Sequence, residues 1–151
     1  MIKSLFSLLF LASLSFATTQ TTTSTPTRTG DFPAKEMKMQ KEEIVKLVAT
    51  EITQTLPQIV DKYTTLASVV AKDTTLIYTF EINTGSKSDE SVQKEDRSRM
   101  KKAVTTGVCQ SSRKFLEAGI STSYLYVSAK SKVELFKFDI SQKNCTGLVN
   151  R

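Results

Sequence analysis

Apolar and polar residues recur with two different periods along this chain, and the periods divide it into predicted helices and strands. From about residue 34 to 55, apolar side chains return every three or four positions, which predicts an amphipathic helix. The stripe consists of Met37, Ile44, Leu47, Val48 and Ile52. We expect the helix to end at Leu56-Pro57, because the residue before a proline avoids the α region.

The following segment changes to a period of two. Residues 66–71 are apolar and β-branched, and from Leu76 to Ile82 apolar side chains alternate with polar ones. This alternation is typical of a half-buried strand, and Lys72-Asp73 is suited to a turn. We therefore predict a β-hairpin, followed by a polar loop over residues 84–88.

A second helical region is predicted from about Asp89 to Val108, with Ser88 or Asp89 as its cap and a thin apolar line through it. Ser111 or Ser112 can cap a further short helix. Gly119 then stands where a helix stop is expected.

The last alternating region predicts a second hairpin, with strands over residues 122–127 and 133–140 joined by a turn at residues 129–131. The element order α-ββ-αα-ββ predicts an α+β fold, in which two hairpins form one antiparallel sheet with helices packed on one face. We expect residues 34–147 to form a single domain. The strand aromatics are expected in its core, and the alternative is a ligand platform made by Tyr124 and Tyr126.

The first seventeen residues are predicted to be a signal peptide. Lys3 gives a positive start, a short leucine- and phenylalanine-rich run follows, and Ser15-Phe16-Ala17 places small residues where a signal peptidase reads. The run is shorter than the ~20 residues of a spanning helix, which disfavours the alternative of an uncleaved anchor. We therefore expect cleavage between Ala17 and Thr18, no transmembrane segment in the mature chain, and a periplasmic or secreted location.

The residues that flank the predicted domain are polar. Residues 18–33 are rich in threonine and serine and are expected to be a disordered leader, and residues 148–151 are expected to be a short tail. No cysteine follows Ala17, so lipid attachment at the mature N-terminus is not expected.

The net charge of +6 falls to +5 when the predicted signal peptide removes Lys3. The densest basic patch lies at Arg97, Arg99, Lys101 and Lys102, next to acidic residues. One interpretation is attraction to an anionic surface; we favour the other, a solvated helix face. No nucleic-acid partner is expected, because the chain carries no recognised binding motif and is predicted to be exported.

The residue types argue against most catalytic chemistry. The chain has no histidine and only two cysteines, so a closed cysteine/histidine zinc site cannot form. No phosphate-binding loop or nucleophile motif is present. We predict no enzymatic activity, no catalytic residues, no metal site and no cofactor; carboxylate-based hydrolysis stays open as an alternative.

The two cysteines, Cys109 and Cys145, are expected to form a disulfide, since an even pair in an exported protein is more often bridged than free. The alternative is a redox or metal-binding thiol pair, which the absence of a CxxC spacing disfavours.

Residues 104–145 carry a recognisable pattern: a cysteine at Cys109, Arg113 four residues on, Gly119, a hairpin bearing Tyr124 and Tyr126, and then Cys145. This pattern resembles that of a group of small periplasmic proteins that includes the β-type pilotins of bacterial type II secretion. The segment Leu56 to Asp61 is similar to their entry into the first hairpin. The resemblance implies an α+β fold, a Cys109–Cys145 bridge, and a peptide groove between the first helix and the sheet.

One departure from these relatives matters for function. Pilotins are lipid-anchored escorts of the secretin, and this chain lacks the lipid-accepting cysteine. We therefore expect a soluble periplasmic binding or accessory protein whose partner is a peptide, a protein or an envelope component. The alternatives are a pilotin-like assembly factor for a secretin, a secreted enzyme inhibitor and a carboxylate-based hydrolase. Arg113 also has a structural interpretation, an ion pair that fixes the helix after Cys109.

Overall fold

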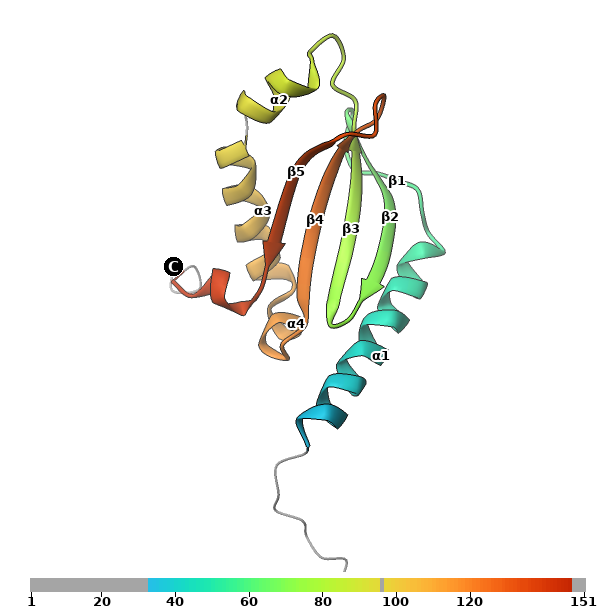
Figure 1. The fold of residues 1–151 in the computed structure, drawn as a ribbon, viewed down its shortest axis with the longest axis vertical. Coiled ribbons are helices and arrows are strands. Elements are labelled where there is room, and N and C mark those ends of the chain that lie inside the picture. Colours follow the sequence, from blue (N-terminus) through green and yellow to red (C-terminus); the bar gives the residue numbers. More distant parts are fainter. Residues whose placement is uncertain (1–32, 96, 148–151) are drawn as a thin grey trace, which may run out of the picture. The chain divides into compact units, whose positions relative to one another are not determined.

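The computed structural model describes residues 33–95 and 97–147, which form a five-stranded sheet with helices on one face (Figure 1). The predicted signal peptide, its cleavage point between Ala17 and Thr18, and almost all of the predicted leader lie outside these residues. The tail from residue 148 also lies outside them.

The elements follow the predicted order, with two additions. In chain order they are α1 (Ala34–Thr53), β1 (Gln58–Ile59), β2 (Thr64–Lys72), β3 (Thr75–Ile82), α2 (Asp89–Glu95), α3 (Arg97–Ser111), α4 (Arg113–Glu117), β4 (Ser121–Ser128), β5 (Glu134–Ile140) and the 3₁₀ turn η1 (Gln142–Cys145). The sequence pattern missed β1 and η1, because two and four residues are too few to establish a period. The α+β class and both hairpins are confirmed.

The sheet is mixed, so the prediction of one antiparallel sheet was wrong. Its strand order is β1-β2-β3-β4-β5, and the two central strands β3 and β4 run parallel, with Thr75 opposite Ser121 and Ile82 opposite Ser128. The reason lies in the connection between the hairpins. Helix α3 has fifteen residues and a length of about 22 Å, enough to return the chain along a strand to the end where β3 begins.

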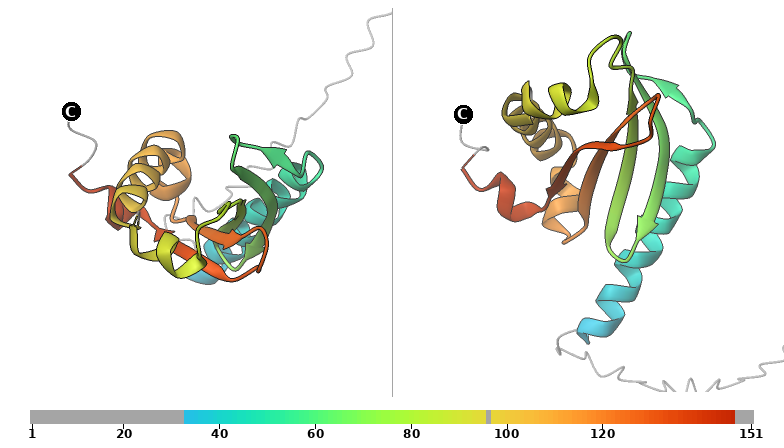
Figure 2. Two further views of the ribbon diagram at one scale, coloured as in Figure 1. Left: turned by 90° about the horizontal axis from the view of Figure 1, so that it is seen from above. Right: turned by 45° about the horizontal axis from the view of Figure 1, so that its top comes forward.

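The helices pack on a single face of the sheet. The main core cluster takes every second residue of β3, namely Leu76, Tyr78, Phe80 and Ile82, together with Tyr124 and Tyr126 of β4. The same cluster receives Val45 and Ala49 from α1 and contacts Met100 and Val104 from α3. Figures 1 and 2 show α1 beside β2 and α3 beside β5, at the two sides of the sheet.

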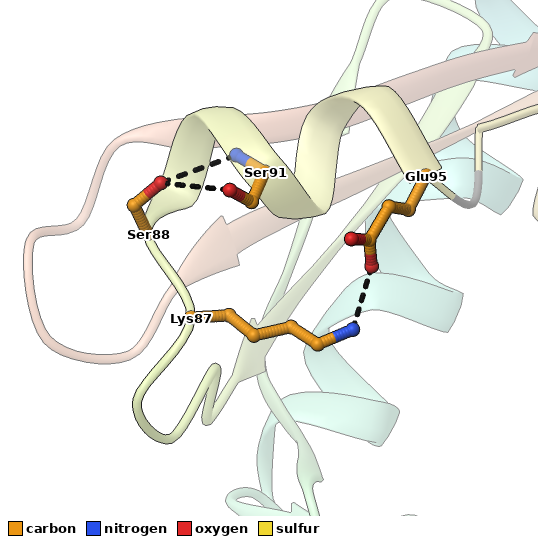
Figure 3. A network of polar contacts seen from close by, with 4 residues as sticks. All are labelled: Lys87, Ser88, Ser91 and Glu95. Atoms are coloured by element: carbon orange, nitrogen blue, oxygen red, sulfur yellow. Dashed lines mark hydrogen bonds and ion pairs between the residues drawn. The ribbon is translucent and has the colours of Figure 1, made fainter.

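Helix α2 begins where the sequence placed its cap. The Ser88 hydroxyl accepts a hydrogen bond from the Ser91 backbone N–H at 3.3 Å and donates one to the Ser91 hydroxyl at 3.1 Å (Figure 3). Lys87 lies 2.6 Å from the Glu95 carboxylate at the far end of the helix. The predicted continuous helix over residues 89–108 is assigned as α2 and α3, which flank residue 96.

Gly119 ends α4 as predicted. Its φ of +79° lies in the left-handed region, and a Cβ there would come within 2.9 Å of the Lys41 ammonium on α1. The backbone conformation is the reason for glycine at this position, because the Lys41 side chain is flexible and can move away from a Cβ. In the described residues no helix is both long and apolar enough to cross a membrane.

Candidate functional site

The two predicted disulfide residues lie together near the end of the sheet. Cys109 on α3 is bonded to Cys145 in η1, with their Cα atoms 5.4 Å apart. Both side chains are buried in a small core of their own with Val108, Leu116 and Ile140. The bridge thus fixes η1, which follows the edge strand β5, against the helices that precede β4.

Arg113 lies close to this disulfide but is not buried. Its Nε donates to Glu117 at 2.9 Å along α4, and about half of each side chain is exposed. An exposed pair of this spacing contributes only a few tenths of a kcal/mol. The ion-pair interpretation of Arg113 fits this geometry, and the contribution of the pair to holding the helix is small.

The strand aromatics form a continuous row across the three strands β3, β4 and β5, on the helix-bearing face. Successive ring centroids are 4.9–6.0 Å apart in the order Tyr78, Tyr124, Phe80, Tyr126, Phe138, Phe136. We call this set the aromatic row. Four of its members are buried, whereas Tyr78 and Tyr124 are half-buried. The expectation that the strand aromatics lie in the core is therefore met by the four buried members. Of the two residues of the alternative ligand platform, only Tyr124 is partly exposed.

The tyrosines of the row keep their hydroxyls unpaired. Within the described residues, the phenol oxygens of Tyr78, Tyr124 and Tyr126 have no hydrogen-bond partner. Only Thr122 Oγ1 is both fully buried and without a partner there, so each of the three phenol oxygens retains at least a small contact with solvent. Desolvation by burial raises the pKa of Tyr78, and it raises those of Tyr124 and Tyr126 to about 12. The phenols are therefore protonated donors at neutral pH.

A cleft of about 720 Å³ opens at the Phe136 end of the aromatic row, and we call it the apolar cleft. It is lined by the β1–β2 loop, by Ile82 of β3, by Val92, Arg99, Met100 and Ala103 of α2 and α3, and by Phe136. Its lining is mostly apolar, and its volume suits a binding site. Next to it Ile59, Val60 and Tyr63 expose 84%, 56% and 58% of their surfaces. Three large apolar side chains are therefore exposed within residues 59–63, at the end of β1 and in the loop that follows it.

The charged groups of the cleft come from its rim. The Asp61 carboxylate accepts the Tyr63 backbone N–H at 2.8 Å, and this hydrogen bond lowers the pKa of Asp61. Lys62 holds its ammonium 5.3 Å from the centre of the Tyr63 ring. With Arg99 on the opposite wall, the rim carries two cations and one carboxylate that is engaged with its own loop.

A hollow of about 470 Å³ lies between the first helix and β2, at the place where the family resemblance implies a groove. It is lined on the helix side by Lys46, Ala49, Thr50, Thr53 and Gln54, and on the sheet side by Val69, Val70 and Ala71. Val45 and Ala49 of α1 are buried against β2, and the Thr53 hydroxyl lies 3.2 Å from the Val69 carbonyl oxygen. The larger opening lies on the other side, toward α3. The sequence could not indicate the apolar cleft, because its walls come from segments more than seventy residues apart.

The described residues offer no metal-binding cluster. No group of three or more histidine, cysteine, aspartate or glutamate side chains in residues 33–95 and 97–147 could hold a metal ion. The carboxylate at the apolar cleft, Asp61, has a lowered pKa, the reverse of a general acid.

Comparison with known proteins identifies the family. Residues 38–136 match a family described as a domain of unknown function, DUF8479, and the chain belongs to that family. No curated protein matches the sequence.

Solved structures share the fold. A crystal structure of a Pseudomonas aeruginosa protein classed as secreted has a TM-score of 0.62 at 15% identity, covering 72% of this chain and 96% of that one. The Vibrio vulnificus type 2 secretion pilotin EpsS has a TM-score of 0.60 at 14% identity, with 74% and 96% covered. The Vibrio cholerae pilotin AspS has a TM-score of 0.55 at 14% identity, with 74% and 97% covered. The pilotin-like fold implied by the sequence resemblance is confirmed.

Proposed function

We propose that this protein is an exported binding module, without catalytic activity, that holds a segment of a partner protein in the apolar cleft. The observation that carries the proposal is the cleft itself, which joins the aromatic row at Phe136 and has Ile59, Val60 and Tyr63 exposed beside it. Burying such a surface against a partner releases apolar area from water, worth about 25 cal/mol per Å² before the costs of association.

The proposal includes the location of the protein. A signal peptide removed between Ala17 and Thr18 would deliver the mature chain to the periplasm or the exterior, where the Cys109–Cys145 disulfide persists. Residues 34–147 then act as the domain and residues 18–33 as a spacer. Mass spectrometry of the native protein tests this part, and an intact Met1 would contradict it.

A second candidate is a pilotin-like accessory role in secretin assembly. The fold shared with two type II secretion pilotins favours it. Deletion of the gene would then displace secretin from the outer membrane, and unchanged secretin localisation would count against this candidate. An enzyme inhibitor or a carboxylate-based hydrolase has no comparable support in the described residues.

The binding proposal is tested by blocking the cleft. Ala103→Trp fills the α3 wall, whereas Lys137→Trp places the same side chain at an exposed β5 position on the opposite face of the sheet. We expect a partner that co-purifies with the native protein from envelope extract to be lost from the Ala103→Trp variant and retained by Lys137→Trp. Equal recovery with both variants would show that the cleft is not the binding site.

A further inference from the structure

We propose that the outer edge of β2 binds an extended, acidic segment of a partner protein, which adds to the sheet as a further strand beside α1. This site is separate from the apolar cleft and goes beyond the proposed function. It follows from peptide groups of Val69 and Ala71 that point away from β3, next to the hollow of about 470 Å³ between α1 and β2.

Strand β2 is paired along only part of its outer side. There β1 lies opposite Thr65 and Leu66, and no later residue of β2 has a strand partner on that side among the described residues. Toward the middle of the sheet, β2 is paired with β3 as far as Lys72. Figure 1 shows α1, rather than another strand, beside this part of β2. The unpaired stretch is therefore a sheet edge, which can template the addition of a strand.

Two separate contacts show which peptide groups of this edge point outward. The N–H of Ala129, just after β4, donates to the Ile82 carbonyl at 2.8 Å, so Ile82 directs its peptide groups toward β4. This direction alternates along a strand, and Val69 and Ala71 lie opposite the β3 residues four and six positions before Ile82. Neither residue therefore exchanges ladder bonds with β3. The Thr53 hydroxyl reaches the Val69 carbonyl from α1, at 3.2 Å, which agrees with an outward direction.

Most of these outward groups are available to a ligand. The single proton of the Thr53 hydroxyl lies between the Ala49 carbonyl oxygen at 2.7 Å and that of Val69 at 3.2 Å, so Val69 receives the weaker share. The Val69 N–H and the N–H and carbonyl of Ala71 have no bond to another segment within residues 33–95 and 97–147. An extended segment can supply matching donors and acceptors, whereas a helix uses its own peptide groups internally.

The charge of the hollow favours an acidic segment. Lys46 is the one charged residue in its lining and has no ion pair in the described part of the chain. The carboxylate one helical turn earlier, Glu42, is paired with Lys38 at 3.4 Å and does not line the hollow. A carboxylate on the added strand would complement Lys46. A second copy of β2 would instead bring its own Lys46 to the same edge, so a different protein fits better.

The test begins with a displayed library of random twelve-residue peptides, selected on the oxidised chain that starts at Thr18. Peptides are retained if they also bind Ala103→Trp, which removes those that bind the apolar cleft. Ala71→Pro deletes an outward N–H at an edge position, where a sheet tolerates proline, and Ala71→Ser keeps it. We expect retained peptides rich in aspartate or glutamate that bind Ala71→Ser normally and Ala71→Pro at least tenfold more weakly.

A second pair of variants leaves β2 unaltered. Thr50→Trp fills the hollow from α1, whereas Glu43→Trp places the same side chain at an exposed α1 position outside the lining. Binding should be lost in the first and kept in the second. Lys46→Glu should weaken binding at least twofold.

Hydrogen exchange of the backbone amides provides a readout specific to strand addition. In the free protein the amides of Val69 and Ala71 should exchange faster than that of Val70, and a bound peptide should slow exchange at both. Unchanged exchange, equal binding to Ala71→Pro and Ala71→Ser, or the absence of retained peptides would overturn the inference. Protection that appears with protein concentration alone, together with a dimer, would assign the edge to a second copy and also overturn it. None of these outcomes bears on the apolar cleft, which Ala103→Trp tests separately.

Discussion

Tyr78 on β3 and Tyr124 on β4 stack with their ring centroids 5.1 Å apart and their planes inclined at 22°. The two residues are direct partners in the parallel register of the central strands. Parallel pairing of β3 with β4 therefore connects the aromatics of the two hairpins into one row, which ends at the apolar cleft. The proposed binding surface therefore depends on the crossover through α2, α3 and α4.

The disulfide should make a large contribution to stability. Bridging residues 36 positions apart removes about 4 kcal/mol of chain entropy from the unfolded state. Reduction should then lower the melting temperature by about 15 °C or more. Calorimetry with and without reductant checks this, and the double variant Cys109→Ser, Cys145→Ser should show no response to reductant. Equal melting of fully oxidised and reduced wild type would contradict the structural role.

Replacing each of two glycines by alanine should change the stability of the fold in opposite directions. Gly119 has a φ of +79° and faces Lys41, so Gly119→Ala should cost about 1–2 kcal/mol. Gly107 lies within α3 with open space where a Cβ would be, so Gly107→Ala should stabilise by about 1 kcal/mol. Urea unfolding of the two variants provides the comparison. A loss of stability in Gly107→Ala would show that α3 is packed differently there.

Neighbouring hydroxyls on opposite faces of β4 offer a second matched pair. Thr122 Oγ1 is buried without a partner in the described residues, whereas the Ser123 hydroxyl donates to Asp139 at 2.7 Å. Thr122→Val should therefore stabilise the fold by about 1 kcal/mol, and Ser123→Ala should destabilise it by a similar amount. Destabilisation by Thr122→Val, measured by denaturant unfolding, would indicate that this hydroxyl has a bound partner.

The tyrosines should make the fold sensitive to alkali. Burial raises the pKa of Tyr124 from 10.0 to about 12, with smaller effects from Tyr78 and Tyr126, and burial also raises that of Tyr126 to about 12. The unfolded chain loses these protons first, so their contribution to stability is complete below pH 10 and is lost as pH rises to about 12. Unfolding free energies across this range should fall less steeply in Tyr124→Phe, Tyr126→Phe. An equal slope in both proteins would contradict the burial of the phenols.

Sequence periodicity was sufficient for the elements but not for the way they join. The stripe from Met37 to Ile52, the two alternating hairpins and the stop at Gly119 are local signals, and each corresponds to an observed element. The alternation of apolar and polar residues in a strand is the same whether the neighbouring strand is parallel or antiparallel. The parallel pairing of β3 with β4 was therefore not predicted. The thirty-eight residues between Ile82 and Ser121 were the available signal, because a crossover of that length suits a parallel pair.

The site was predicted only in part, for a related reason. Tyr124 and Tyr126 were identified because both are on one face of one strand. The disulfide was predicted because the chain has only two cysteines. The apolar cleft combines the β1–β2 loop with α3 and β5, so it exists only once the chain is folded. Residues such as Ala103 and Tyr63 carry no signal of this role on their own.

The most direct test of the central claim is photo-crosslinking in the native cell. A benzophenone amino acid at position 103 would lie in the apolar cleft, and one at position 137 would lie on the opposite face. We predict that position 103 forms an adduct with one segment of one envelope protein, identified by mass spectrometry, and that position 137 does not. The absence of an adduct from position 103, or the same adducts from both positions, would contradict a partner-binding role for this cleft.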